Sequence, residues 1–556
     1  MSPEEFNQNT RALIDGLKSV CADYGLGNDG NEFKIITQTF LYKFLNDKFA
    51  YEVKQLSEEV RNAGDNWAEA LAAMSEDDYQ FLVMELSAGT ATLYPKHFLS
   101  TLYQKQNEER NDEDGITAFN ETFDDTLQDI ATVNSDIFSV SSASGESIKL
   151  FEPIIRSYIT DPSDRDGFAR AIVNKLIPFS FEPIFSQNFD FYSAIFEYLI
   201  KDYNSDSGGK YAEYYTPHAV AKIMASILAP EEKANVTCYD PSAGSGTLLM
   251  NLAHALGEQN CTIYTQDISQ KSSNLLRLNL ILNNLVGSIP NVIKGNTILE
   301  PYPFHQKTDG APEKFDFIVS NPPFKLDFTD WRESLDTEVN KDRFFAGIPK
   351  VPAKKKESMA IYQLFLQHII DKLSPTGKAA IVVPTGFLTA QSGIDKKVRQ
   401  KLVEEKILAG VVSMPSNIFA STGTNVSIVF VDKGHESENA ILIDASKLGK
   451  TIKEDKNQKT VLRLNEEESI IDIFLNQTVA DGLSVSPKFS EIKEKNYSFS
   501  AGQYFEVKIE YVDITETEFQ EKLSNSQQQL SRFFTESKSL EKSIAQQLTT
   551  LQFNEQ

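Results

Sequence analysis

The chain has 556 residues, of which 41% are hydrophobic and 24% are charged, a composition typical of a globular protein with two or more domains. Its net charge of −25 argues against a surface that binds nucleic acid over its whole extent. The longest apolar stretch is short and interrupted by proline and glycine, so we expect no membrane span. The acidic N-terminus is unlike a signal peptide, and three scattered cysteines indicate neither disulfides nor a zinc site. We therefore expect a cytoplasmic protein without a bound metal.

The first 185 residues are expected to form an all-helical domain, because apolar residues recur at helical spacing and strand signals are few. The clearest helix lies in residues 33–49, FKIITQTFLYKFLNDKF. The segments 139–147 and 204–210, rich in serine and glycine, predict loops.

Strands and helices alternate from about residue 236 onward. Strands are expected at 235–240, 261–267, 291–296, 315–320, 378–384, 407–414, 425–432 and 440–446. Helices are expected at 247–256, 272–284, 357–373 and 395–406. This order predicts an α/β domain over residues 186–450, with a doubly wound, mainly parallel sheet and an antiparallel hairpin at one edge.

The remaining residues, 451–556, are expected to form a C-terminal region that ends in a long helix. Apolar residues recur there at intervals of three, four and seven, at Ile514, Phe519, Leu523, Leu530, Phe533, Leu540, Ile544, Leu548 and Leu551. The pattern predicts an amphipathic helix with a seam like that of a coiled coil. It is compatible with a helix that folds back on its own chain and with one that packs on a partner helix.

A glycine-rich turn, DPSAGSGTLL at residues 240–249, follows one predicted strand and opens a helix. Gly244 and Gly246 allow close approach of the backbone to a ligand, and the free N–H groups at the helix start favour an anion. The turn lacks the GK[ST] ending of a P-loop. Asp267 ends the next strand and is placed to accept hydrogen bonds from a ribose, or else to cap the following helix. Together these features predict a site for a nucleoside-bearing cofactor.

Two further segments carry candidate site residues. In YAEYYTPHAV (211–220), Thr216 and Pro217 have the pattern of a helix start, while Glu213 and two tyrosines are suited to lining a pocket. In VSNPPFK (319–325), two prolines make the end of a strand rigid between an asparagine and a phenylalanine. Such a tip is an unusual way merely to end a strand.

These motifs, DPSAGSG, QD and NPPF preceded by AEYYTPH, resemble those of the S-adenosylmethionine-dependent methyltransferases that make N6-methyladenine in DNA. Their order resembles the gamma arrangement of that family. The chain is similar throughout to the modification subunit of type I restriction–modification systems, most strongly over residues 190–430. The resemblance implies S-adenosylmethionine as cofactor and double-stranded DNA as substrate.

The resemblance also assigns roles to residues. Asn321, Pro322, Pro323 and Phe324 would be catalytic: the Asn321 oxygen and the Pro322 carbonyl would accept hydrogen bonds from the adenine amine, and Phe324 would stack on the flipped base. The cofactor would lie beside Glu213, Tyr214, Tyr215, Thr216, Pro217, His218, Asp240, Ser242, Ala243, Gly244, Ser245, Gly246, Asp267 and Asn296. Asn296 stands where many family members have an acid. The basic segment 341–356 would contact DNA through Lys341, Arg343, Lys350, Lys354, Lys355 and Lys356.

Nothing after residue 450 is large enough to read a DNA sequence in the major groove, so recognition is expected to reside in another chain. The resemblance implies a specificity subunit bound by two modification subunits, and a restriction subunit for cleavage. Two alternatives stay open: a stand-alone adenine methyltransferase, and a scaffold subunit of a defence complex that binds cofactor without catalysis.

Overall fold

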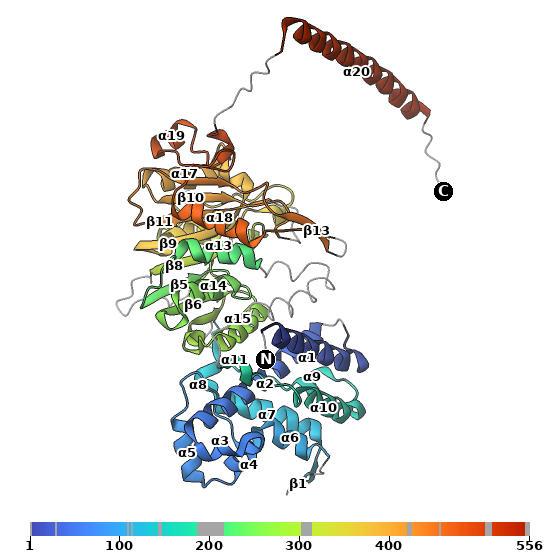
Figure 1. The fold of residues 1–556 in the computed structure, drawn as a ribbon, viewed down its shortest axis with the longest axis vertical. Coiled ribbons are helices and arrows are strands. Elements are labelled where there is room, and N and C mark those ends of the chain that lie inside the picture. Colours follow the sequence, from blue (N-terminus) through green and yellow to red (C-terminus); the bar gives the residue numbers. More distant parts are fainter. Residues whose placement is uncertain are drawn as a thin grey trace. The chain divides into compact units, whose positions relative to one another are not determined.

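The computed structural model describes residues 3–27, 30–107, 110–112, 115–142, 147–185, 216–301, 314–419, 425–454, 457–505 and 514–550 (Figure 1). The chain divides into two compact units, Met1–Tyr504 and Phe505–Gln556. The first unit contains all of the sheet and the helices that cover it, and the second contains one long helix.

The N-terminal part of the first unit is mainly helical, as the sequence predicts. Its helices are α1 (Pro3–Asp23), α2 (Gly30–Leu56), α3 (Glu58–Ala63), α4 (Trp67–Ala72), α5 (Glu76–Met84), α6 (Leu99–Lys105), α7 (Phe119–Val133), α8 (Ser135–Phe138), α9 (Ile154–Tyr158), α10 (Pro162–Leu176) and α11 (Glu182–Phe185). Serine or aspartate side chains cap α3, α5 and α10 at Ser57, Ser75 and Asp161. Helix α2 is central to this region, because its side chains are buried on every side over most of its length.

The same region also contributes strands, which the sequence does not predict. Strands β1 (Arg110–Asp112) and β2 (Gly115–Thr117) form a small hairpin. Strands β3 (Val140–Ser142) and β4 (Ser147–Ile148) pair with each other, and β3 runs parallel to β7 of the large sheet. The prediction of a loop at 139–147 is therefore wrong near both ends of that segment, because residues 140–142 and 147 are in strands. The loop expected at 204–210 lies outside the described residues.

The large sheet has eleven strands in the order β15-β12-β10-β11-β9-β8-β5-β6-β7-β3-β4. Its strands from residue 216 onward are β5 (Val236–Asp240), β6 (Cys261–Asp267), β7 (Val292–Lys294), β8 (Phe315–Ser320), β9 (Leu373–Pro384), β10 (Leu408–Ser413), β11 (Val426–Asp432), β12 (Ile441–Asp444) and β15 (Ser484–Val485). The five strands from β7 to β9 are parallel. The antiparallel pair β10–β11 is present but does not form an edge, because β12 and β15 continue the sheet beyond β10.

Helices cover this sheet as a doubly wound fold requires. They are α13 (His218–Leu228), α14 (Thr247–Leu256), α15 (Gln270–Leu282), α16 (Tyr362–Lys372), α17 (Gly393–Glu404), α18 (Leu464–Leu475) and α19 (Phe489–Glu494). Helix α13 packs against α14 and α18, α14 packs against β5, and α16 packs against β9 and α17. Strands β8 and β11 are buried along nearly their whole length, and β9 is buried along its second half, because both faces of the sheet are covered there.

The C-terminal region begins within the first unit. Strands β13 (Lys450–Glu454) and β14 (Asn457–Val461) form a hairpin, and α18 contacts both α13 and β12. The second unit contains α20 (Glu516–Thr550), which confirms the long helix expected at the end of the chain. Among the described residues, no helix combines the length and apolar character that crossing a bilayer requires.

Candidate active site

Three neighbouring strands end in the residues that the sequence singles out. Asp240 ends β5, Asp267 ends β6, and Ser320 ends β8 just before Asn321. Strand β5 is parallel to both β6 and β8, so the carboxyl ends of all three meet at one edge of the sheet. This is the edge at which α/β proteins bind ligands.

The glycine-rich turn after β5 has a backbone that requires glycine. Gly244 and Gly246 have φ of 53° and 84°, in the left-handed region that glycine adopts at little cost. A Cβ at position 246 would lie 2.2 Å from the Cδ1 atom of Leu276 on α15. The side chain of Asn279, also on α15, donates a hydrogen bond to the Ser245 carbonyl across 2.8 Å. Contacts from Leu276 and Asn279 of α15 therefore fix the shape of the turn.

The two aspartates at the strand ends are held by the same turn. The Oδ1 atom of Asp240 accepts from the Ser242 N–H at 2.9 Å, and the Oδ2 atom of Asp267 accepts from the Gly244 N–H at 3.0 Å. Burial raises the pKa of Asp240 to about 8, and the negative charge of Asp267 adds to that effect. Burial also raises the pKa of Asp267. The cap of α15 is Ser269, whose side chain accepts from the Ser272 N–H, so Asp267 is not needed as its cap.

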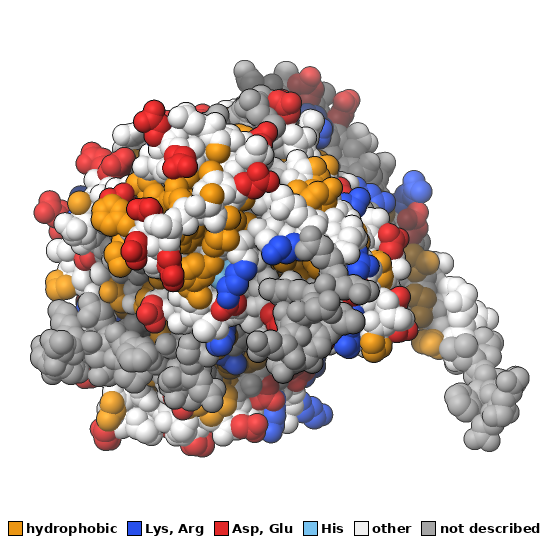
Figure 2. All heavy atoms as spheres, turned by 90° about the horizontal axis from the view of Figure 1, so that it is seen from below, with side chains coloured by type: hydrophobic (Ala, Val, Ile, Leu, Met, Phe, Trp, Pro, Cys, Tyr) orange, Lys and Arg blue, Asp and Glu red, His pale blue; other side chains and the backbone are white. Residues whose placement is uncertain are grey.

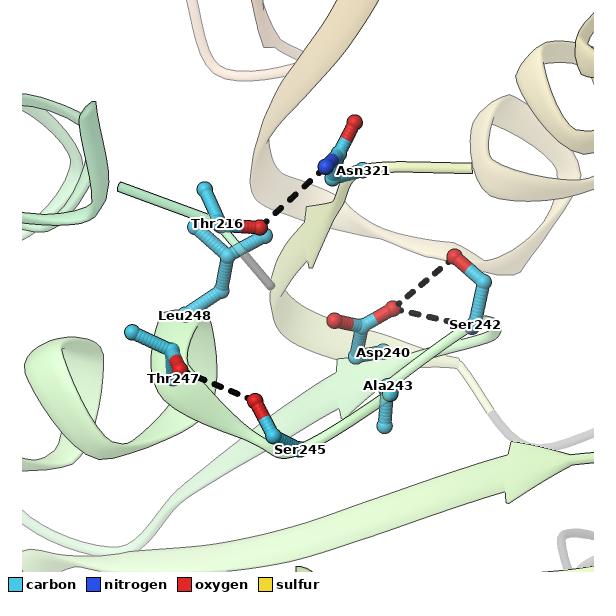
Figure 3. A pocket seen from close by; sticks show the side chains of 9 residues that line it. Thr216, Asp240, Ser242, Ala243, Ser245, Thr247, Leu248 and Asn321 are labelled. Atoms are coloured by element: carbon cyan, nitrogen blue, oxygen red, sulfur yellow. Dashed lines mark hydrogen bonds between the residues drawn. The ribbon is translucent and has the colours of Figure 1, made fainter. Parts of the chain in front are cut away.

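Thr216 contacts the tip of β8. Its hydroxyl accepts a hydrogen bond from the Asn321 side-chain amide at 3.2 Å, whereas Pro217 is the cap of α13 and no side chain caps that helix. In Figure 3 the amide nitrogen of Asn321 faces Thr216 and its oxygen points away. The helix-start interpretation of Thr216 is therefore wrong, and this contact leaves the Asn321 oxygen available as an acceptor.

Asn321 and the glycine-rich turn line one pocket (Figure 3). Its lining residues are Thr216, Asp240, Ser242, Ala243, Gly244, Ser245, Thr247, Leu248 and Asn321. Seven of the nine are residues that the sequence assigns to the cofactor or to catalysis. Thr247 and Leu248 were missed, although both belong to the DPSAGSGTLL segment that drew attention to the turn.

Other predicted site residues lie away from this pocket or outside the described residues. Glu213, Tyr214 and Tyr215 lie outside the described residues. His218 begins α13, and its buried Nδ1 atom has no hydrogen-bond partner among the described residues. Asn296 is not among the residues that line the pocket; its Oδ1 atom accepts from the Ile298 and Leu299 N–H groups, each at 3.1 Å, and so forms a turn.

Phe324 is supported by a ring that the sequence did not point out. The Tyr362 ring lies edge-on to the Phe324 ring, with centroids 6.2 Å apart and planes at 75°. The Tyr362 hydroxyl donates to both carboxylate oxygens of Asp395, at 2.9 and 2.8 Å, and the Gln363 amide donates to the same carboxylate at 2.7 Å. Phe324 itself is half-buried, which leaves part of its ring accessible.

The basic segment 341–356 divides into exposed and buried cations. Lys341, Lys350, Lys354, Lys355 and Lys356 are exposed. Arg343 is buried, and its guanidinium donates to the carbonyls of Thr297 and Ile298 and to the ring of His368. The expectation that Arg343 contacts DNA is therefore corrected, because its donors are directed into the protein. The negative net charge does not prevent local basic surface, since lysine and arginine gather in places on the face drawn in Figure 2.

The residues at this edge of the sheet suit the cofactor that the resemblance implies. Asp240 is buried and Asp267 is half-buried, the same turn holds both, and no ion pair links either to a cation among the described residues. A ligand that carries a sulfonium and an ammonium group would supply positive charge where burial disfavours two carboxylates. The left-handed glycines open the turn to a ligand that approaches its backbone. Among the described residues, no cluster of three His, Cys, Asp or Glu side chains is placed to hold a metal ion.

Comparisons with known proteins identify the family of the chain. A family model described as N-6 DNA Methylase matches residues 187–512. The chain is 25% identical over 500 residues to the type I restriction enzyme MpnII methylase subunit of Mycoplasma pneumoniae, covering 87% of this chain and 88% of that protein. It is 24% identical over 533 residues to the MjaVIII methylase subunit of Methanocaldococcus jannaschii, covering 94% and 83%.

A solved structure shares the fold. It is the type I restriction-modification system methyltransferase subunit from Streptococcus thermophilus, with a TM-score of 0.69 and 22% identity. The match covers 91% of this chain and 100% of that one, so the fold extends well beyond the sheet domain.

Proposed function

Because the chain belongs to the N-6 DNA methylase family, we propose that it is the modification subunit of a type I restriction–modification complex. In this proposal it transfers a methyl group from S-adenosylmethionine to the N6 atom of a flipped-out adenine in DNA. The observation that carries the proposal is that Asn321 lines the same pocket as Asp240, Ser242 and Gly244. The acceptor for the adenine amine and the cradle for the methyl donor thus lie side by side.

The geometry supports activation of a poor nucleophile. The adenine amine is unreactive because its lone pair is delocalised into the ring, and S-adenosylmethionine supplies a methyl group already activated by its positive sulfur. The Asn321 Oδ1 atom and the Pro322 carbonyl accept the two amine hydrogens, which localises the lone pair on nitrogen. The two prolines and the Thr216 hydrogen bond hold these acceptors before the base arrives. Phe324 stacks on the base and retains it outside the duplex.

The test of this chemistry is Asn321→Ala in the assembled complex. Cofactor affinity, measured by calorimetry, should stay within about threefold of wild type, while transfer of tritiated methyl to unmodified DNA should fall by about a hundredfold or more. The exposed Asn476, at the C-terminal cap of α18, gives a matched control as Asn476→Ala. Wild-type methyl transfer by Asn321→Ala would contradict the proposed role.

The exposed lysines of the segment 341–356 are proposed to contact DNA phosphates. Lys354, Lys355 and Lys356 are consecutive and exposed, and they lie in the connection that leaves the Asn321 tip for α16. Replacing all three with glutamine should weaken DNA binding at every sequence and reduce its salt dependence. Replacing the exposed Lys447, Lys488 and Lys493, which lie outside both this segment and α20, in the same way is the control. An unchanged salt slope in the first variant would reject the contact.

Helix α20 is proposed to dock on a specificity subunit that reads the DNA sequence. Large apolar side chains on it are exposed within the second unit, among them Phe519, Leu530, Phe533 and Leu540. A stripe of this kind is stable in water when another helix covers it. Leu530→Lys with Leu540→Lys should prevent assembly without changing cofactor binding by the chain, whereas Ser539→Lys with Gln546→Lys, on the opposite face of α20, should assemble normally.

We propose two such subunits for each specificity subunit, with a restriction subunit added for cleavage. Light scattering of the complex purified from its native host measures this ratio. The complex is proposed to act in the cytoplasm, where cofactor and chromosomal DNA are both present. We propose that residues 1–185 form a supporting helical domain and that residues 186–450 form the methyltransferase domain. Residues 451–556 are proposed to serve subunit assembly.

Two results would favour the alternatives. Sequence-specific methylation by the isolated chain would indicate a stand-alone enzyme. A complete complex that binds cofactor and transfers no methyl would indicate a scaffold subunit.

A further inference from the structure

Residues 325–361, between the Phe324 tip and α16, form a small lobe with its own apolar core. Phe328, Leu335, Phe344, Met359 and Ile361 from the lobe pack there with Ile298, Leu364 and Phe365. The Leu326 N–H donates to the Met359 carbonyl at 3.1 Å, which closes the base of the lobe. The lobe is therefore a folded element beside the proposed catalytic tip, and it carries the exposed lysines.

Arg343 fastens this lobe to the rest of the protein through three separate hydrogen bonds. Its guanidinium donates to the Ile298 carbonyl at 2.8 Å, to the Thr297 carbonyl at 2.8 Å and to the Nδ1 atom of His368 at 3.0 Å. Arg343 is only 7% exposed, so these bonds are shielded from water. The guanidinium donates from three separate nitrogens in one plane, whereas the three donors of a lysine share one nitrogen, so a lysine does not reproduce this geometry.

Two of these acceptors lead directly to the cofactor turn. The Thr297 hydroxyl donates to the Pro241 carbonyl at 2.7 Å. Because His368 Nδ1 accepts from Arg343, the neutral ring carries its proton on Nε2 and donates it to the Tyr239 hydroxyl at 3.1 Å. Arg343 is thus linked to Pro241 through Thr297 and to Tyr239 through His368. Pro241 and Tyr239 flank Asp240, which lines the pocket.

We infer that Arg343 is a positioning residue that couples the lobe at 325–361 to the cofactor turn, so that occupation of the pocket orders the lobe for DNA. The inference rests on the proposed function for its substrate and goes beyond it in naming the connection. An apolar side chain in place of Arg343 would fill the same space but would form none of its three directional hydrogen bonds. The burial of the guanidinium, which lowers the pKa of Arg343 to about 10, is the energetic cost of that arrangement.

The test compares Arg343→Lys and Arg343→Met with Arg332→Lys. Arg332 is a matched control because it belongs to the same lobe and its bonds stay inside it, to the Pro349 carbonyl, Glu333 and Asp336. Circular dichroism establishes that each variant is folded. Backbone hydrogen exchange is then measured on the chain with and without S-adenosylmethionine.

In wild type and in Arg332→Lys, we expect the cofactor to slow exchange in residues 325–361 by at least about fivefold. In Arg343→Lys this protection should vanish, while cofactor affinity stays within about threefold of wild type. In the assembled complex the same variant should lower kcat for methyl transfer about tenfold or more, with a smaller change in KM for the cofactor. Arg343→Met, which keeps apolar volume, should behave like Arg343→Lys.

Cofactor-dependent protection that persists in a folded Arg343 variant would overturn the inference. Loss of protection in Arg332→Lys to the same extent would overturn it as well, because the effect would then belong to lobe stability alone. The exchange measurement needs no methyl transfer, so a wild-type chain that shows the protection, in an assembled complex that methylates no DNA, would reject the proposed function and leave the coupling standing.

Discussion

The Asn321 amide donates a hydrogen bond to the Thr216 hydroxyl across 3.2 Å, although 105 positions separate the two residues in the chain. This bond fixes which end of the amide faces the pocket opening. With the nitrogen held by Thr216, the oxygen points away from Thr216 (Figure 3). A methyltransferase that must accept an amine hydrogen at Asn321 depends on that orientation.

Thr216→Val should therefore reduce methyl transfer while leaving the fold intact. Valine has nearly the same shape and removes only the acceptor, so the Asn321 side chain loses its preferred orientation. The loss of one such bond, roughly 1 to 1.5 kcal/mol, corresponds to about a tenfold decrease in kcat. Thr216→Ser keeps the hydroxyl and should retain most of the activity. Equal rates for the valine and serine variants would show that the bond has no orienting role.

Gly246→Ala should abolish cofactor binding by deforming the turn. Its φ of 84° is unfavourable for alanine, and the added Cβ would lie 2.2 Å from Leu276 Cδ1. We expect a loss of about 2 kcal/mol or more in stability and no measurable cofactor binding by calorimetry. Gly287→Ala is the control, because a Cβ there meets nothing within 4 Å. Normal cofactor affinity in Gly246→Ala would mean that the turn does not form the cradle.

The strands and turns around the pocket could be predicted because their signals are local. Apolar runs bounded by Asp240 and by Asn321 mark β5 and β8, and Gly246 marks the start of α14. The positions of Thr216 and Arg343 could not be predicted, since each is decided by a partner remote in sequence. Thr216 precedes a proline and so has the pattern of a helix cap, and Arg343 lies among lysines that are exposed.

The strands β3 and β4 were missed for a related reason. Residues 139–147 are mostly serine and glycine, a composition typical of a loop. Val140–Ser142 and Ser147–Ile148 are strands because β3 pairs with the edge of β7, and because Arg277 of α15 donates to the carbonyls of Phe138, Ile148 and Lys149. Tertiary hydrogen bonding, which has no local signature, overrides the composition there.

Tyr362→Leu should weaken retention of the flipped base. Tyr362 braces the edge of the Phe324 ring and is itself tied to Asp395, so its loss lets the stacking ring tilt. We expect KM for DNA to rise about three- to tenfold while cofactor affinity is unchanged, and 2-aminopurine at the target position to report less unstacking. Tyr497→Leu, which removes a similar tyrosine–carboxylate pair with Glu404, is the control. A KM for DNA that matches wild type would exclude the bracing role.

Cofactor affinity should depend on pH through Asp240. Burial raises the pKa of Asp240 in the folded chain to about 8, whereas an exposed carboxyl titrates near about 3.9. The folded state therefore holds this proton more tightly, and the stability of the cofactor-free protein should fall as pH rises from about 4 to about 8. A bound cation near the carboxylate reverses the preference, because it favours the ionised form.

Binding of S-adenosylmethionine should consequently release a proton near neutral pH. Below pH 8 its affinity should weaken by up to about tenfold for each unit of acidification, and calorimetry in buffers of different ionisation enthalpy counts the proton directly. Asp240→Asn removes this titration while the cofactor's own amino group titrates as before, so the difference between the two proteins isolates the aspartate. If both proteins gave identical pH profiles, the positive charge of the cofactor would lie away from Asp240. The methyl donor would then also lie away from the Asn321 tip.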